Sequence, residues 1–402
     1  MKYFPIEVER VKSSNKLNIP TPPPLSLYIH YPWCIKKCPY CDFNSHTITQ
    51  SIEHDEKIYL ESIILDLQQQ LPLIWGRAVN TIFIGGGTPN LISPQGMHYL
   101  MNQLRALLRL QPHAEITMEA NPGILSKDRF EAYYDAGINR VSIGIQSLNN
   151  HHLHTLGRIH NQSEALHTLD VARTIFNNIN ADLMYGLPQQ TIKEAQYDIE
   201  KIIQSGIPHI SAYQLTIEPN TWFYHQPPKI PSEEKLTDIE QIIHTTLDKY
   251  QYKRYEISAF SQPNFQCQHN LNYWYFGDYL GIGAGAHGKL TFHDKIIRTQ
   301  HKKNPKSYIR SIKEQNFISN FQITIPQEDL ASEFMMNALR LIDGFELKLY
   351  TQRTGLNLTS IQQPLLSAQS KNLITIKNNS LKPTSLGINF LNNLIELFFD
   401  NE

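Results

Sequence analysis

The chain has 402 residues, which gives room for a large core and predicts two domains, and its formal net charge of -1 offers no basic surface for a nucleic-acid backbone. No apolar run approaches the roughly 20 residues of a membrane span, and the charged N-terminus lacks the apolar stretch of a signal peptide. Three of the four cysteines lie in one loop, which excludes the disulfide framework of a secreted protein and predicts a cytoplasmic location.

Residues 1–24 predict a flexible lead-in that ends in a short proline run, and residues 25–31 predict the first strand. From there, short apolar runs alternate with segments of helical periodicity. The further strands are predicted over 81–84, 115–119, 140–145, 181–185 and 210–217, and the helices between them include 53–71, 94–110 and 163–176. This alternation is typical of parallel strands joined by right-handed crossovers.

Polar motifs follow nearly every one of these strands, which is where barrel enzymes place their sites. We therefore predict an α/β fold with an incomplete (β/α)6-type barrel over residues 25–325. A doubly wound dinucleotide-binding fold is disfavoured, because the glycine stretch Gly85-Gly86-Gly87-Thr88-Pro89 does not match G-x-G-x-x-G.

The segment LYIHYPWCIKKCPYCDFNSH carries Cys34, Cys38 and Cys41, three thiols within eight residues. A structural zinc site closes with four protein ligands, whereas this loop provides three. Three thiolates favour a [4Fe-4S] cluster with one open iron, which can bind the amino and carboxylate groups of S-adenosylmethionine (SAM). The loop resembles the signature of the radical SAM superfamily. A zinc knuckle or three free thiols are the alternatives.

The glycine stretch follows the second predicted strand, and its glycines allow the backbone to approach a ligand closely. Members of the superfamily use such a stretch to hold the methionine part of SAM. The resemblance therefore implies that Gly86, Gly87 and Thr88 contact this cofactor.

Four polar residues lie at or beyond later strand ends: Glu119 in MEANP, Gln146 in GIQS, Arg158 in LGRIH and Asp182 in ADLMYGLP. SAM presents an adenine edge, a ribose diol and a charged amino acid, so carboxylates, an amide and a cation suit it. Residue by residue, these four match the SAM-binding pattern of the oxygen-independent coproporphyrinogen III oxidase family.

The resemblance to that family extends from about residue 25 to the C-terminus. It implies a radical SAM barrel, with Tyr28 beside the cluster, Tyr40 in the adenine region and His287 of GIGAGAHG as a further contact. Two features differ from the oxidases. They carry another cysteine two residues after the third cluster cysteine, where this chain has Phe43 after Asp42, and they have a longer N-terminal arm than the 25 or so residues seen here.

The segment from His269 to Trp274, HNLNYW, matches the H-N-x-x-Y-W motif of the HemW heme chaperones, a branch of this family. A neutral imidazole suits axial ligation of heme iron, and the flat rings of Tyr273 and Trp274 suit the macrocycle. The resemblance implies His269 as the iron ligand, and Cys267 is a second candidate.

Three other histidines, His151, His152 and His154, lack acidic partners at metal-ligand spacing, and we expect them to be solvated. Residues 326–402 predict a small α+β domain of winged-helix type, with a helix over 328–341 and a hairpin over 373–383. From residue 330 onward it carries six Lys or Arg and six Asp or Glu, a balance that favours protein packing or ligand closure over DNA binding.

The resulting hypothesis is a heme chaperone that binds a [4Fe-4S] cluster, SAM and heme and delivers the heme to an acceptor protein. A membrane-bound respiratory hemoprotein is one candidate acceptor, and the family implies a flavodoxin-like reductant. Neither nucleic acid nor an integral membrane segment is expected. The rivals are the oxidase, which decarboxylates two propionates of coproporphyrinogen III, and a zinc-binding structural protein. No catalytic residue is assigned, so catalysis stays open.

Overall fold

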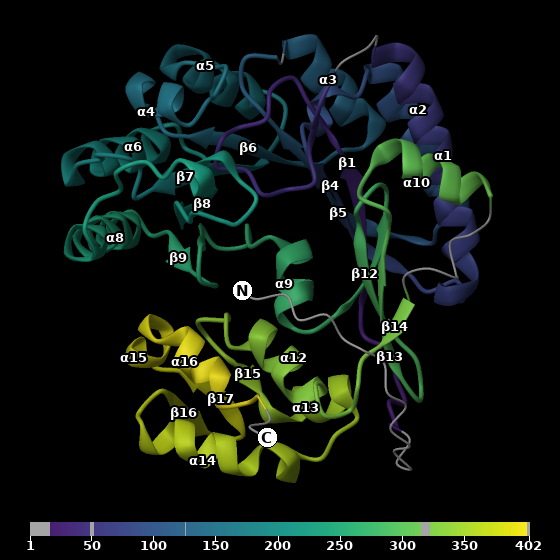
Figure 1. The fold of residues 1–402 in the computed structure, drawn as a ribbon, viewed down its shortest axis with the longest axis vertical. Helices are drawn as coiled ribbons and strands as arrows, with labels where there is room; N and C mark the ends of the chain where they lie inside the picture. The colour runs from purple at the N-terminus through teal and green to yellow at the C-terminus, as the bar shows by residue number, and fades with distance from the viewer. Residues whose placement is uncertain (1–16, 49–51, 125, 315–321, 400–402) are drawn as a thin grey trace.

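The structure, a computed structural model, describes residues 17–48, 52–124, 126–314 and 322–399. The larger part of the chain forms a curved sheet with helices along its outer side, and the C-terminal domain lies below it (Figure 1). The first 16 residues of the predicted lead-in lie outside the described residues.

Six parallel strands form the centre of the sheet, in the same order in space as along the chain. They are β1 (Leu25–Tyr31), β4 (Val79–Gly86), β5 (Leu110–Ala120), β6 (Arg140–Gln146), β7 (Asn178–Tyr185) and β8 (His209–Gln214). Every residue of β6 is buried, as is typical of a parallel strand with both faces covered. The predicted (β/α)6-type partial barrel is confirmed.

Helices connect these strands and cover the outer face of the sheet (Figure 1). They are α1 (Ile52–Ile74), η1 (Pro89–Leu91), α2 (Pro94–Leu107), α3 (Lys127–Ala136), α4 (Asn150–Thr155), α5 (Gln162–Arg173), α6 (Ile192–Gln204), α7 (Trp222–His225) and α8 (Glu233–Lys249). Local sequence sets where two of them begin, because Asn161 with Glu164 and Thr191 with Glu194 form capping boxes at α5 and α6. The apolar faces of the helices and strands form one continuous core.

The sheet continues beyond both edges of the six-stranded barrel and has 12 strands in the described part of the chain. Beyond β1 come the parallel strand β11 (Asp278–Ile282) and then β12 (His287–Thr291), β13 (Ile296–Gln300) and β14 (Gln322–Thr324). Beyond β8 come β10 (Ala259–Ser261) and β9 (Lys253–Arg254), both antiparallel. Between these segments lie α9 (Gln268–Trp274), which packs on β1, β4 and β11, and α10 (Pro305–Lys313).

The C-terminal domain has a three-stranded antiparallel sheet covered by helices, which confirms the predicted winged-helix type. Its elements are α12 (Leu330–Ala338), β15 (Phe345–Glu346), α13 (Leu347–Thr354), η2 (Leu358–Ile361), α14 (Gln362–Ser370), β16 (Ile374–Lys377), β17 (Ser380–Pro383), α15 (Ser385–Asn389) and α16 (Leu391–Glu396). Its core also buries Leu17, Ile19, Phe276 and Ile296 from other parts of the chain, so the domain is packed onto the barrel.

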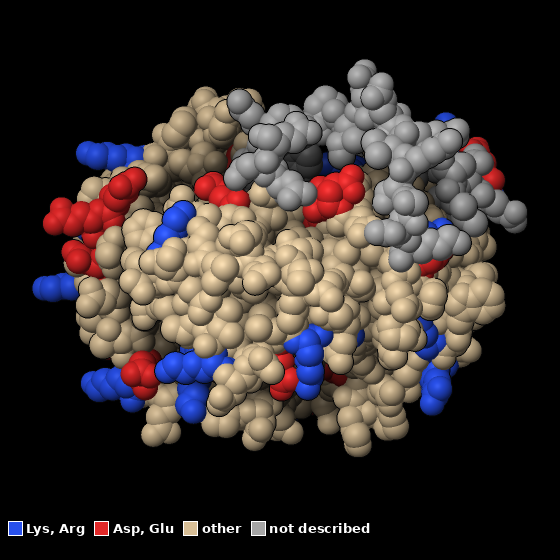
Figure 2. All heavy atoms as spheres, turned by 90° about the horizontal axis from the view of Figure 1, so that it is seen from below, with Lys and Arg blue, Asp and Glu red and all other residues tan. Residues whose placement is uncertain are grey.

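Figure 2 shows the molecule from below, on the side of the C-terminal domain. Acidic and basic side chains lie mainly around the rim of this face, and other residues cover its middle. Charges of both signs are therefore mixed over the part of this face that the structure describes. None of the described helices combines the length and the apolar character needed to cross a bilayer.

His152 corrects one expectation from the sequence. It was predicted to be solvated, but its side chain is buried and its Nε2 lies 3.5 Å from the carboxylate of Glu194. Burial lowers its pKa, so its ring is neutral at neutral pH. The acidic partner is Glu194, which completes the capping box of α6. The sequence did not reveal this contact, because Glu194 lies far from His152 along the chain.

Candidate cofactor site

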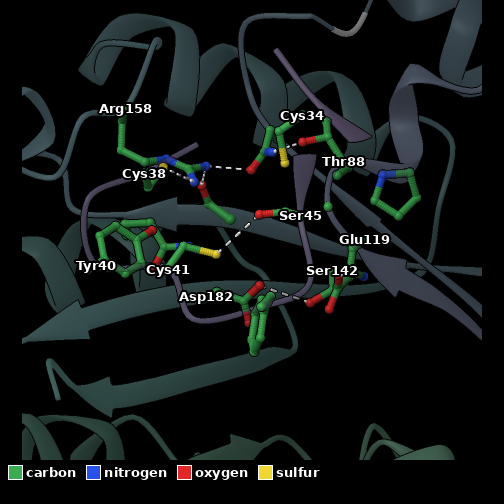
Figure 3. Close-up of a pocket in the computed structure, with 18 of the residues that line it drawn as sticks. Cys34, Cys38, Tyr40, Cys41, Ser45, Thr88, Glu119, Ser142, Arg158 and Asp182 are labelled. Carbon is green, nitrogen blue, oxygen red and sulfur yellow. Dashed lines mark hydrogen bonds between the residues drawn. The ribbon is translucent and has the colours of Figure 1, made fainter. Parts of the chain in front are cut away.

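The three clustered cysteines, Cys34, Cys38 and Cys41, lie on the loop after β1 and line one cavity of about 410 Å³ (Figure 3). Pairing of β2 (Trp33–Cys34) with β3 (His46–Thr47) holds the two ends of this loop together. Burial raises the pKa of Cys34 and Cys41, so both thiols are protonated until a metal displaces their protons.

The three thiols line a common cavity. In the described part of the chain, no group of three or more His, Cys, Asp or Glu side chains is placed to hold one metal ion. Arg158 Nη1 lies 3.9 Å from the sulfur of Cys38, and Ser45 Oγ lies 3.9 Å from that of Cys41. Such polar neighbours suit sulfur atoms that ligate a metal centre. The loop therefore offers three sulfur atoms with polar neighbours on one cavity wall, a donor set that suits an iron-sulfur cluster.

The predicted glycine stretch packs directly against the cysteine loop. The N–H of Gly87 donates to the carbonyl of Tyr31 at 2.7 Å, and that of Thr88 donates to the carbonyl of Trp33 at 2.8 Å. A Cβ at Gly87 would lie only 2.6 Å from the Trp33 carbonyl oxygen, so a larger residue would displace the loop. Gly86 has a φ of +114°, which also favours glycine. The two motifs thus form one structural unit.

Two predicted carboxylates, Glu119 of β5 and Asp182 of β7, line the same cavity (Figure 3). Glu119 Oε2 accepts the N–H of Gly86 at 2.9 Å, while Asp182 accepts hydrogen bonds from Ser142 at 3.1 Å and Asn180 at 2.7 Å. Burial, with the nearby charge of Asp182, raises the pKa of Glu119 to about 7, and burial raises the pKa of Asp182. A cationic ligand would favour ionisation of both, so the pair suits a positively charged group.

Gln146, Arg158 and Tyr40 complete the cavity wall. Gln146 ends β6 with a φ of +66°, and its Oε1 accepts the hydroxyl of Tyr213 at 2.6 Å. Backbone strain of this kind in a residue other than glycine is retained mainly at functional sites. Arg158 Nη2 donates to the carbonyl of Gly144 at 2.8 Å, which holds the guanidinium beside the cysteine loop.

A second cavity, of about 490 Å³, adjoins the first and shares Phe43, Gly86 and Glu119 with it. Its walls carry many rings and several cations. They include Tyr28, His30, Tyr273, Trp274, Phe276, Tyr279, His287, Lys289, Arg298 and Lys303. The structure therefore places four predicted site residues, Tyr28, Tyr273, Trp274 and His287, in this second cavity rather than among the residues that line the first.

His269 lines neither of these two cavities. It is 1% exposed, and its Nδ1 lies 2.7 Å from Thr81 Oγ1 and its Nε2 lies 2.9 Å from the hydroxyl of Tyr273. Because Thr81 donates its own proton to Ser26, Nδ1 carries the proton of the imidazole and Nε2 accepts from Tyr273. Burial lowers the pKa of His269 to about 3, so it is neutral. In this structure His269 supports Tyr273 from behind the cavity wall.

Cys267, the second candidate for an iron ligand, is also buried and lines neither cavity. Its sulfur lies 3.6 Å from Glu115 Oε1, and burial raises its pKa to about 12. The thiol is therefore protonated, and it has no part in the cysteine loop.

Sequence reasoning missed several residues of the first cavity. They include Phe43, Ser45, Asn121, Ser142, Ser211 and Tyr213. Some of them could have been predicted from the alternation of side chains along a strand. Ser142 lies four residues before Gln146 on the same face of β6, and Ser211 and Tyr213 share one face of β8. No local signal marks Phe43 or Ser45, which belong to the cysteine loop.

Comparison with known families matches residues 28–202 to the radical SAM superfamily and residues 325–390 to the HemN C-terminal domain. The heme chaperone HemW of Haemophilus influenzae is 44% identical over 96% of this chain and 100% of its own length. The heme chaperone HemW of Escherichia coli is 45% identical over 94% of this chain and 98% of its own length. That of Bacillus subtilis is 34% identical over 84% of this chain and 88% of its own.

Among solved structures, coproporphyrinogen III oxidase (HemN) from Escherichia coli has a TM-score of 0.79 with this chain. The match covers 94% of this chain and 90% of that protein, at 23% sequence identity. At this identity the likeness shows a shared fold.

Proposed function

This chain belongs to the HemW family of the radical SAM superfamily, and from that premise we propose that it is a heme chaperone that binds a [4Fe-4S] cluster, SAM and heme and passes the heme to an acceptor protein. One observation carries this proposal. The cavity lined by Tyr273 and Trp274 of the HNLNYW motif adjoins the cysteine cavity, so a flat ligand and a cluster-bound cofactor would lie next to each other.

Cys34, Cys38 and Cys41 would hold the cluster, and the open iron would take the amino and carboxylate groups of SAM. When bound, the cluster supplies an electron and an open coordination site. Glu119 and Asp182 provide the negative charge for the cationic parts of the cofactor. The backbone from Gly86 to Thr88 lets its methionine part approach closely.

The rival function is oxidative decarboxylation of coproporphyrinogen III, and it draws support from the complete set of SAM-binding residue types in the first cavity. Phe43 argues against it, because it lies two residues after Cys41, where the oxidases carry a further cysteine. Phe43 lines both cavities, so the difference falls on the wall that the cofactor cavity shares with the proposed heme site. An acceptor hemoprotein and a flavodoxin-like reductant, acting in the cytoplasm, are the partners that we propose.

Heme transfer tests the proposal. The full chain, reconstituted anaerobically with iron, sulfide and SAM, would be loaded with heme and mixed with the heme-free form of a b-type cytochrome. We expect the cytochrome spectrum to appear as the heme leaves the chain. The control variant is Tyr134→Phe, which removes the hydroxyl of an exposed ring on α3 that lines neither cavity. A wild-type chain that binds no heme, or that never releases it to the acceptor, would contradict the proposal.

A further inference from the structure

The second cavity contains two histidines, His30 and His287, and only one of them is available to a ligand. His30 is buried, with Nδ1 2.9 Å from the hydroxyl of Tyr28 and Nε2 2.8 Å from the carbonyl of Asn44. His287 begins β12 and is exposed, and its ring has no hydrogen-bond partner among the described residues. Partial burial and the charges of Arg298 and Lys303 lower its pKa, so it presents a neutral imidazole.

Strand register places cations beside His287. Because side chains alternate along a strand, His287 and Lys289 lie on one face of β12, and Lys289 pairs with Arg298 of β13. Two of the cations have acidic partners, since Lys289 binds Asp278 at 3.0 Å, a carboxylate that it shares with Arg77, and Arg298 forms an ion pair with Glu333.

Lys303 follows the same hairpin, is exposed, and has no ion-pair partner in the described part of the chain. Its backbone carbonyl accepts the side-chain N–H of Asn44 at 2.9 Å, and Asn44 also donates to the carbonyl of Ala284. The cysteine loop is thereby tied to the segments on either side of the β12–β13 hairpin. Lys303, a cation without an acidic partner in the described part of the chain, thus lies at the edge of a cavity whose other walls combine aromatic rings with charged side chains, including Asp42 and Glu119.

We propose that heme lies in this second cavity with His287, rather than His269, as the protein ligand to iron, and with Lys303 contacting a propionate. The inference rests on the proposed function, since it takes heme as the ligand. The macrocycle would lie against Tyr28, Tyr273 and Trp274, and the volume of about 490 Å³ falls within the usual range of roughly 300–1,000 Å³ for ligand sites. Ligation by His269 would instead break the hydrogen bond that it accepts from Tyr273 or the one that it donates to Thr81, and would move a buried ring.

Heme titration of the full reconstituted chain distinguishes the two histidines. We expect His287→Ala to lose the absorption spectrum of imidazole-ligated heme and to bind heme about tenfold more weakly or worse, with unchanged cluster iron and SAM affinity. Added free imidazole should restore the ligated spectrum in this variant. The matched control is His293→Ala, an exposed histidine in the turn of the same hairpin, and it should behave like the wild type.

A second titration addresses the propionate contact. Lys303→Gln should weaken heme binding roughly two- to fivefold, the range of a partly exposed ion pair. It should leave the binding of heme dimethyl ester unchanged, because the ester has no carboxylate. Lys306→Gln, an exposed lysine on α10, is the matched control.

The outcomes separate this inference from the function on which it rests. If the wild type binds heme and His287→Ala keeps its spectrum and affinity while His269→Ala loses them, the ligand assignment is wrong and the heme-binding function stands. If Lys303→Gln weakens the ester as much as heme, the propionate contact is wrong. If the wild type binds no heme, both the inference and the proposed function fail.

Discussion

The charge of Glu119, in the first cavity, depends on pH near neutrality. Its pKa is raised from 4.5 to about 7 in the folded chain, so the folded state retains a proton that the unfolded chain releases. The ligand-free fold therefore loses stability as the pH rises from about 4.5 to 7. Binding of a cation requires the ionised carboxylate, so SAM affinity should fall as the pH drops below about 7.

The substitution Glu119→Gln should weaken SAM binding roughly 10- to 100-fold near pH 8, because it removes a charge-assisted contact. It should also stabilise the ligand-free protein by about 1–3 kcal/mol at that pH, since no buried carboxylate needs to ionise. Calorimetric titration with SAM and denaturant unfolding near pH 6 and pH 8 measure both effects. Glu131→Gln, on the exposed face of α3, is the control. Unchanged SAM affinity would remove Glu119 from the site.

A second prediction is that the iron-sulfur cluster depends on the cysteines of the loop and not on Cys267, the buried cysteine outside it. Cys34→Ala should lose most of the cluster iron after anaerobic reconstitution, because a cluster with only two thiolate ligands is weakly held. Cys267→Ala should keep the iron, because this thiol lies beside Glu115 and outside the cysteine cavity. Iron and sulfide analysis with the absorption spectrum gives the answer. Retention of iron in the first variant and its loss in the second would reverse the assignment.

At the residue scale, most of the first cavity was predictable, because carboxyl ends of parallel strands meet at one edge of a sheet. Glu119, Gln146 and Asp182 come from three successive strands and line one cavity, as that rule requires. The division between two cavities was not predictable. Tyr28 and His287 share the second cavity only because β11 pairs with β1, a contact between segments far apart in the chain.

At the element scale, the contact between the glycine stretch and the cysteine loop gives a direct prediction. In Gly87→Ala, the added methyl group would meet the Trp33 carbonyl oxygen at 2.6 Å, so the loop must shift. We expect lower cluster iron and weaker SAM binding, with a loss of stability of about 1–3 kcal/mol. Iron analysis and thermal unfolding measure these effects.

The control for that substitution is Gly76→Ala, which has no atom within 4 Å of its added Cβ but has a φ of +65°. It should cost about 1 kcal/mol through backbone strain and leave the cluster intact. Equal iron in the two variants would show that the glycine stretch does not position the cysteine loop.

Apolar periodicity predicted where the strands and helices lie, but it predicted the residues at which they end less accurately. The predicted strand over residues 210–217 ends at Gln214 in the structure. Its remaining apolar residues, Leu215 and Ile217, pack instead with Tyr40 and Tyr213 in a small separate cluster beside the first cavity. The apolar run is therefore real, but its last residues pack with Tyr40 and Tyr213 of the cavity wall instead of continuing the strand, and a single sequence does not reveal that change of partner.

At the scale of the whole molecule, the barrel and the C-terminal domain meet at the second cavity. Phe276 lines this cavity and belongs to the C-terminal core, where its ring lies 5.6 Å from that of Phe334. Phe334→Ala should lower the free energy of unfolding by about 3–5 kcal/mol and should also weaken heme binding, because the cavity wall loses its support.

Phe130→Ala is the matched control, since Phe130 is equally buried but packs against Phe176 in the barrel core. Denaturant unfolding and heme titration, both at a temperature where each variant is folded, provide the comparison. If the two variants lose heme affinity equally, the C-terminal domain has no specific role in the cavity.

The sequence predicts a separate C-terminal domain over residues 326–402, but it does not indicate how that domain packs on the barrel. Ile19 and Phe276 flank the barrel strands in sequence and carry no pattern that assigns them to the C-terminal core. Likewise, β14 extends the sheet by pairing with β13, although helix α10 lies between them in the chain. Such contacts depend on tertiary packing, which local periodicity does not encode.

One preparation tests the central claim most directly: the full chain reconstituted anaerobically with cluster and SAM, supplied with a reductant, and offered heme in one sample and coproporphyrinogen III in another. Heme stoichiometry is read by absorption, and porphyrin products are read by chromatography. We predict close to one heme per chain and no conversion of coproporphyrinogen III. Turnover to protoporphyrinogen, with no stable heme complex, would contradict the chaperone function and favour the oxidase.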